Sequence, residues 1–196
     1  MSSSISKTQK DTRARGDMQP LVIIVMGVSG CGKSTITENI VAGIKARGLG
    51  VHGKDGDELH PKENIKKMEA GLPLTDEDRQ PWLEQLATYA REKAEKHGIC
   101  VLACSALKQC YRDTINAAGK VVYVFLDGSH ELIASRMHER TGHFMPESLL
   151  DSQFAALEDP RNEPHVITVS IEPNPEQVAA HAVTLLEQRG YLQFNA

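Results

Sequence analysis

The chain has no run of residues long and apolar enough to cross a membrane, and no apolar core of the kind found in signal peptides follows its polar first nineteen residues. The first absence argues against a membrane protein, and the second argues against a secretory signal peptide. Positive charge is not in excess either, because 22 Lys and Arg residues face 26 Asp and Glu residues, for a net charge of -4. A broad basic surface for nucleic acid or anionic lipid is therefore not expected.

Cysteines are also few, and none of their spacings is typical of a zinc site or of a secreted disulfide framework. The four are Cys31, Cys100, Cys104 and Cys110. This pattern predicts reduced thiols in a cytoplasmic protein. The Ser-rich start of the chain is short of apolar side chains, so we predict a disordered tail over 1–19 and a single domain over 20–196.

Five short apolar segments alternate with helical patterns over the rest of the chain. This alternation predicts an α/β fold with a parallel sheet and right-handed crossovers. We expect Asp76 to cap the long third helix, a fourth helix to start at Ala106, and Leu185 to face inward on the last helix. The predicted strands are 21–26, 51–54, 99–104, 121–126 and 166–171, and the predicted helices are 33–47, 61–70, 76–96, 106–117, 129–140, 147–157 and 175–190.

The most specific motif is the octapeptide 27–34, GVSGCGKS, which fits G-x-x-x-x-G-K-[ST] in full. The backbone N–H groups of such a loop cradle phosphates together with the positive end of the following helix. Lys33 is expected to reach the β- and γ-phosphates, and the Ser34 hydroxyl is expected to ligate Mg²⁺. An ordinary Gly-rich turn is the alternative, but the flanking strand and helix favour nucleoside triphosphate binding. The predicted nucleotide-binding residues are Gly27, Val28, Ser29, Gly30, Cys31, Gly32, Lys33, Ser34 and Thr35.

Two aspartates, Asp55 and Asp57, directly follow the second predicted strand. Ligands of doubly wound sheets bind at the carboxyl ends of the strands. One aspartate could hold Mg²⁺, and the other could orient an acceptor hydroxyl and take its proton as the γ-phosphoryl group leaves ATP. The third predicted strand ends without an aspartate, which favours Asp55 as the metal ligand. A surface Asp-Gly turn is the alternative.

Several basic residues could bind an anionic substrate or the phosphates. Arg79 stands beside the only tryptophan, where its guanidinium could bind a carboxylate, although a packing and capping cluster is a serious alternative. Lys108 and Arg112 are equally consistent with substrate contacts and with solvated helix charges. The basic residues of 136–145 flank a glycine and predict a lid over 140–148 that excludes water and counters charge on the phosphoryl group. A plain helix end is the alternative there.

The order of these motifs resembles that of the small P-loop gluconokinases, which are related to shikimate kinases and nucleoside monophosphate kinases. The phosphate loop alone is shared by very many proteins, whereas the combination of blocks is far more specific. The chain departs from the family in having Cys31 where Ser is more usual and in its long tail. The matching blocks, all between residues 21 and 160, include DGDELHP at 55–61, DRQPWL at 78–83, ACSALK at 103–108, GHFM at 142–145 and LLDSQF at 149–154.

The resemblance implies phosphorylation of D-gluconate at its 6-hydroxyl by direct in-line transfer from Mg-ATP, which gives 6-phosphogluconate and ADP. It also implies strand order 2-3-1-4-5, substrate-binding helices over about 60–95, a mobile lid and a homodimer. The first alternative is a kinase of another small anionic acceptor, such as shikimate or a nucleoside monophosphate. The second is a nucleotide-binding module without enzymatic activity.

The resemblance further implies roles for individual side chains. Asp57 would engage the acceptor hydroxyl, and Arg79 would contact a carboxylate or hydroxyl of the substrate. The lid residue Arg140 would reach the phosphates. Arg136 would lie beside the adenine ring, with Pro173 on the other side of the slot. The other side chains implied to contact the sugar acid are His60, Lys108, Arg112, His143 and Gln153.

Overall fold

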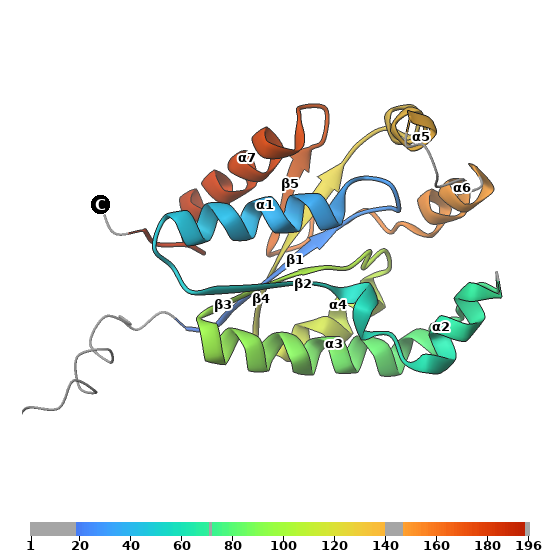
Figure 1. Ribbon diagram of the computed structural model, residues 1–196, viewed down its shortest axis with the longest axis horizontal. Coiled ribbons are helices and arrows are strands. Elements are labelled where there is room, and N and C mark those ends of the chain that lie inside the picture. Colours follow the sequence, from blue (N-terminus) through green and yellow to red (C-terminus); the bar gives the residue numbers. More distant parts are fainter. Residues whose placement is uncertain (1–18, 71, 140–146, 195–196) are drawn as a thin grey trace, which may run out of the picture.

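The computed structural model describes residues 19–70, 72–139 and 147–194, and it contains a five-stranded parallel sheet between layers of helices (Figure 1). The strands pair in the order β2-β3-β1-β4-β5, and each pair is parallel. The predicted fold class and strand order are therefore confirmed. The strands are β1 (Leu21–Met26), β2 (Val51–Asp55), β3 (Ile99–Ala103), β4 (Lys120–Asp127) and β5 (Val166–Ser170).

Long helices cover the faces of the sheet, and shorter ones gather where the strands end (Figure 1). One face is covered by α1 (Lys33–Ala46) and α7 (Pro175–Gln188), and the other by α3 (Asp76–His97), α4 (Gln109–Ile115) and the short turn η3 (Asn116–Ala118). At the carboxyl end of the strands lie η2 (Gly56–Leu59), α2 (Lys62–Glu69), α5 (His130–Glu139) and α6 (Glu147–Ala156). Among the described residues, no helix is long and apolar enough to span a bilayer.

The core forms two apolar layers, one on each face of the sheet. Because side chains alternate along a strand, Ile23 and Val25 of β1 join the layer under α1 and α7, whereas Val22 and Ile24 join the layer under α3. All six residues of β1 are buried, which explains why this segment is apolar without alternation. The central strand thus holds the start of the phosphate loop in a fixed place.

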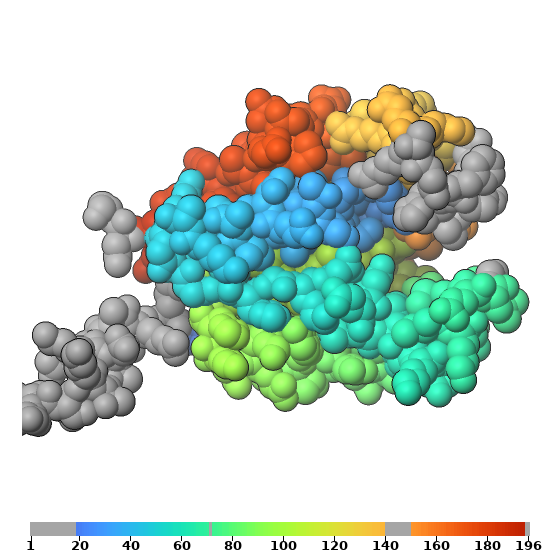
Figure 2. All heavy atoms as spheres, in the orientation of Figure 1, coloured from blue at the N-terminus to red at the C-terminus, as the bar shows by residue number. Residues whose placement is uncertain are grey.

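The region 60–95 contains α2 and α3, and α2 projects at the edge of the molecule (Figure 2). Asn64 is the buried residue of α2, and its Nδ2 donates to the carbonyl of Asp78 at 2.9 Å. Lys67 pairs with the carboxylate of Asp78, with Nζ 2.6 Å from Oδ1. Polar contacts therefore attach α2 to the first turn of α3. The substrate-binding role of these helices stays a prediction.

The predicted cap of α3 is wrong. Thr75, not Asp76, is the N-cap residue, because its hydroxyl accepts from the backbone N–H of Asp78 at 3.2 Å. The carboxylate of Asp78 accepts in return from the backbone N–H of Thr75 at 3.0 Å, which completes a capping box. Asp76 is left to interact through its side chain with α4.

Two details of the other helices also differ from prediction. The fourth helix begins at Gln109 rather than Ala106, since Ala106 has φ +45°, outside the range of a right-handed helix. On α7, Leu186 is fully buried, whereas Leu185 only packs against the edge of the core. Residues 1–18 of the predicted tail and 140–146 of the predicted lid lie outside the described residues. The predictions for the tail, Arg140 and His143 therefore stay predictions.

Candidate active site

The phosphate loop connects β1 to α1 in a shape that depends on glycine. Gly32, the N-cap of α1, has φ +96°, and Gly30 has φ +83°. A Cβ atom on Gly30 would lie 2.6 Å from Sδ of Met137 on α5, so the loop and this helix approach too closely for a side chain. Cys31 is 2% exposed and belongs to the apolar core, so a small side chain that packs well fills the position where Ser is more usual.

Lys33 begins α1 and turns its ammonium group back across the loop. Its Nζ atom donates to the carbonyl of Gly27 at 3.1 Å and to the carbonyl of Val28 at 3.0 Å. The charge is therefore held over the first residues of the loop. A phosphate group that entered the loop would meet this cation together with backbone N–H donors.

The two predicted metal ligands lie together. The hydroxyl of Ser34 donates to Oδ2 of Asp55 at 2.5 Å, which joins the first turn of α1 to the end of β2. Both are oxygen ligands of the kind that Mg²⁺ prefers. Among the described residues, no group of three or more His, Cys, Asp or Glu could hold a metal. Ser34 and Asp55 would therefore suit a Mg²⁺ ion that takes its other ligands from phosphate oxygens and water, and this metal site stays a prediction.

The turn η2 carries Asp57 and is fixed from three sides. Oδ1 of Asp55 accepts from the backbone N–H of Asp57 at 3.0 Å. The indole Nε1 of Trp82 on α3 donates to the carbonyl of Gly56 at 3.0 Å. A Cβ atom on Gly56 would lie 2.4 Å from the carbonyl oxygen of Ala103, so the turn also rests directly against β3. This arrangement sets the position of Asp57 without contacts to its own carboxylate.

The carboxylate of Asp57 opens to the solvent, with 76% of its side chain exposed. Its pKa is nevertheless raised above the ordinary value, mainly by desolvation and further by the negative charge of Asp55. Lys33 and Arg79 act in the opposite direction. A more basic carboxylate with an open face suits a group that accepts a proton from a hydroxyl.

His60 lies directly behind Asp57 and is buried. Its ring stacks on Trp82 with centroids 4.0 Å apart and an interplanar angle of 16°, and its Nε2 lies 3.9 Å from Oδ1 of Asp57. Burial, assisted by the charge of Arg79, lowers the pKa of His60 to about 4. Nδ1 lies 3.4 Å from Nδ2 of Asn64, so we assign the proton of the neutral ring to Nε2, which faces Asp57.

Acidification below pH 6.5 is expected to destabilise the protein through His60. The imidazole of the unfolded chain takes up a proton near pH 6.5, whereas the buried ring stays neutral down to about 4. Above pH 6.5 the imidazole is neutral in both the folded and the unfolded chain. As the pH falls, the loss of unfolding free energy due to His60 grows to about 3 kcal/mol at most. Urea denaturation at pH 7 and pH 5 checks this, with His60→Gln as the comparison. An equally large loss of stability in both proteins would contradict the assignment.

Two of the cations predicted to bind the substrate, Lys108 and Arg79, lie near Asp76 and Tyr111. Nζ of Lys108 donates to both carboxylate oxygens of Asp76, at 2.9 and 2.7 Å, and the hydroxyl of Tyr111 donates to the same carboxylate. These hydrogen bonds lower the pKa of Asp76. Arg79 donates to the carbonyl of Leu74 at 3.4 Å, and its guanidinium lies 6.0 Å from the ring centroid of Tyr111. The positive charge of Lys108 is thus paired with Asp76, whereas the charge of Arg79 acts to lower the pKa of Asp57.

Arg112 is not a solvated helix charge, so that one of its two sequence interpretations is wrong, whereas its predicted substrate contact stays a prediction. Its side chain is 1% exposed, and it pairs with the carboxylate of Glu163. It also donates to the carbonyls of Ala106 at 2.7 Å and Leu107 at 3.0 Å. Arg112 therefore braces the irregular segment between β3 and α4. No sequence signal distinguishes such a buried arginine from an exposed one.

Gln153 lies at the phosphate loop. It belongs to α6, and its Oε1 accepts from the backbone N–H of Ser29 at 2.6 Å. The predicted contact with the sugar acid would therefore have to be made from the phosphate-loop side of the site.

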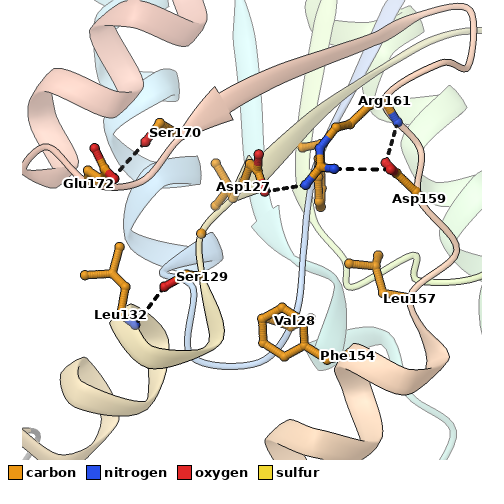
Figure 3. Close-up of a pocket in the computed structure, with 13 residues that line it drawn as sticks. Val28, Asp127, Ser129, Leu132, Phe154, Leu157, Asp159, Arg161, Ser170 and Glu172 are labelled. Atoms are coloured by element: carbon orange, nitrogen blue, oxygen red, sulfur yellow. Dashed lines mark hydrogen bonds and ion pairs between the residues drawn. The ribbon is translucent and has the colours of Figure 1, made fainter.

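The two residues predicted to enclose the adenine ring, Arg136 and Pro173, belong to segments that touch, and their role stays a prediction. A guanidinium nitrogen of Arg136 on α5 donates to the carbonyl of Glu172 at 3.1 Å, directly before Pro173. Next to it, a cavity of about 630 Å³ lies at the carboxyl ends of β4 and β5, beside Val28 of the phosphate loop (Figure 3). The helix that carries Arg136 and the segment of Glu172 thus both lie near the phosphate loop.

Sequence reasoning missed the polar groups of this cavity. Arg161 lies between Asp127 and Asp159, at 2.9 and 3.2 Å from their carboxylates (Figure 3). The pairing ties the segment after α6 to the end of β4. Asp127 could have been found by the rule that singled out Asp55, because it too ends a strand. Arg161 carries no comparable signal.

A phosphate loop after the central strand of a 2-3-1-4-5 sheet, facing an aspartate pair after the edge strand, defines the chain as a P-loop kinase. Comparisons with known proteins narrow the class. A family model described as "Adenylylsulphate kinase" matches residues 19–145. The chain is 43% identical over 162 residues to "Gluconokinase" of Gluconobacter oxydans (strain 621H), covering 82% of this chain and 88% of that protein.

Two further comparisons agree. The chain is 46% identical over 152 residues to "Thermosensitive gluconokinase" of Escherichia coli (strain K12), covering 76% of this chain and 78% of that protein. The crystal structure of a gluconokinase from Sinorhizobium meliloti 1021 superposes with a TM-score of 0.74 at 44% identity, covering 88% of this chain and 94% of that one. The chain belongs to the gluconokinase family, within the P-loop kinases that the adenylylsulphate kinase model describes.

Proposed function

We infer that the chain transfers the γ-phosphoryl group of ATP to gluconate. One observation supports this most strongly: the hydrogen bond of 2.5 Å from Ser34 to Asp55 places the phosphate loop against the turn that carries Asp57. A nucleotide in the loop and an acceptor at Asp57 would thus share one cleft. Membership of the gluconokinase family gives the acceptor its identity.

We propose the following roles in the transfer step. The loop N–H groups and Lys33 bind the phosphates, and Asp57 accepts the proton of the acceptor hydroxyl. The hydroxyl oxygen forms a bond to the γ-phosphorus as the bond to the bridging oxygen breaks, and ADP leaves. Mg²⁺, when bound through Ser34 and Asp55, would supply positive charge to the phosphates. His60, neutral and stacked on Trp82, lies behind the carboxylate of Asp57, with Nε2 3.9 Å from Oδ1.

For the acceptor we propose the 6-hydroxyl of D-gluconate, with the carboxylate of the sugar acid bound by Arg79. Lys108 is the weaker candidate for the carboxylate, because Asp76 already pairs with its charge. Arg136 and Pro173 would enclose the adenine ring. Roles for Arg140 and His143 in the lid, and a cytoplasmic homodimer, remain proposals that rest on the family resemblance and, for the compartment, on the four thiols.

A comparison of acceptors tests this function. Release of ADP should be followed by a coupled assay with gluconate, shikimate or AMP, and without an acceptor. We expect kcat/KM for gluconate to exceed that for the other two by at least about 100-fold, because a site built around one polar acceptor rejects others strongly. Equal, slow ADP release under all four conditions would contradict a gluconate kinase and indicate a nucleotide-binding module instead.

A further inference from the structure

Gln153 places a side-chain amide on the phosphate loop. Its Oε1 accepts from the backbone N–H of Ser29 at 2.6 Å, although 124 positions separate the two residues. Only the oxygen of the amide can accept from an N–H group, so this contact fixes the orientation of the amide. The same amide therefore carries Nε2, with its two N–H donors, to the mouth of the loop.

The amide lies at the end of the loop where the outer phosphates are expected. The lysine of a phosphate loop reaches the β- and γ-phosphates. Here Nζ of Lys33 is held by the carbonyl of Val28 at 3.0 Å, and Val28 directly precedes Ser29. Gln153 and the ammonium group of Lys33 thus border the same few residues of the loop.

The neighbours of Gln153 hold this part of α6 in place. Oδ1 of Asp151 lies 2.7 Å from Nε2 of His130, the first residue of α5. The ring of Phe154 packs against the same histidine, with centroids 5.3 Å apart. Phe154 and Val28 also line one cavity (Figure 3). Gln153 is therefore presented to the loop by a helix that is anchored on both sides of it.

We propose that Gln153 binds the γ-phosphate of ATP and makes α6 sensitive to the difference between ATP and ADP; the proposal rests on the kinase function above. A γ-phosphate oxygen and Oε1 of Gln153 would compete for the N–H of Ser29, and the anionic oxygen is the stronger acceptor. The displaced amide can then donate through Nε2 to the same phosphate. ADP has no γ-phosphate, so the bond from Ser29 to Gln153 persists when ADP is bound.

Binding of two nucleotides to two variants tests the proposal. The dissociation constants of ADP and of the non-hydrolysable analogue AMP-PNP should be measured calorimetrically with Mg²⁺ present. For Gln153→Ala we expect AMP-PNP to bind about five- to tenfold more weakly, with ADP changed less than about twofold, because a hydrogen bond to a charged group is lost. Gln153→Glu should weaken AMP-PNP by more than about thirtyfold, since a carboxylate repels the phosphate and holds the N–H of Ser29 more strongly.

The control is Gln188→Glu, which adds the same charge at the exposed end of α7, far from α6 (Figure 1). It should leave the ratio of the two dissociation constants unchanged. Equal weakening of AMP-PNP and ADP by the Gln153 variants would overturn the proposal, because a purely structural role affects both nucleotides alike. Phosphorylation of gluconate by the wild-type protein is measured separately, so that failure of the proposed function and failure of the Gln153 contact give different results.

Discussion

Lys33→Ala is expected to lower kcat/KM for phosphoryl transfer by about 10³-fold or more, because it removes the cation that offsets charge on the transferred phosphoryl group. The described hydrogen bonds of Nζ are to the carbonyls of Gly27 and Val28, at the surface of the loop rather than in the core. The fold should therefore survive the substitution. The expected defect is catalytic, and it should appear in kcat as well as in KM for ATP.

Steady-state kinetics with ATP varied at saturating gluconate measures this effect, and circular dichroism and thermal unfolding check the fold. Lys45→Ala is the matched control, since Lys45 lies on the exposed side of the same helix. It should retain wild-type kinetics. Turnover of Lys33→Ala within about threefold of wild type, in a folded protein, would show that the loop lysine does not act on the phosphates.

Asp57→Asn is expected to lower kcat by about 10² to 10⁴-fold while changing the dissociation constant of ATP by less than about threefold. The amide keeps the shape of the side chain but cannot accept the proton of the acceptor hydroxyl. The turn should stay in place, because Trp82 holds Gly56 and Asp55 holds the backbone N–H of Asp57. Kinetics together with equilibrium ATP binding separates the two effects.

The raised pKa of Asp57 adds two expectations with opposite signs. Activity of the wild-type protein should fall as the pH drops through this pKa, because the base becomes protonated. Stability behaves differently: a carboxyl whose folded pKa is raised costs stability above that pKa, so Asp57→Asn should unfold at a higher temperature at pH 7. Asp113→Asn, on the exposed face of α4, should change neither property. A matching loss of ATP affinity, or a lower unfolding temperature, would count against a role at the acceptor.

The parts of the site that follow directly from the chain order were predictable. β1 is apolar at all six positions and is followed at once by the glycine pattern, so the sequence places the loop at the end of a buried strand. Asp55 and Asp57 follow β2 in the same way. Parallel strands end at one edge of the sheet, so the rule places the phosphate loop and the two aspartates at the same edge, where Ser34 contacts Asp55.

The remaining details depend on contacts between distant segments, for which the sequence has no periodic signal. The sequence leaves Arg112 open between a substrate contact and a solvated helix charge, and only the fold shows that Glu163 and two backbone carbonyls surround its guanidinium. Thr75 and Asp76 are both good cap residues, and the choice between them depends on which one meets Asp78. Ala106 lies in a helical pattern, yet its positive φ ends that pattern before α4 starts.

The contact between Trp82 and the turn of Asp57 also places the tryptophan fluorescence of the protein beside this turn. Trp82 is the chain's single tryptophan, is 4% exposed, and touches both Gly56 and the ring of His60. Its indole is therefore an intrinsic fluorophore next to the turn that carries Asp57. None of its described contacts is with the phosphate loop. Gluconate can be titrated against this emission without any label, and a spectral change on adding sugar acid would originate at the turn that carries Asp57.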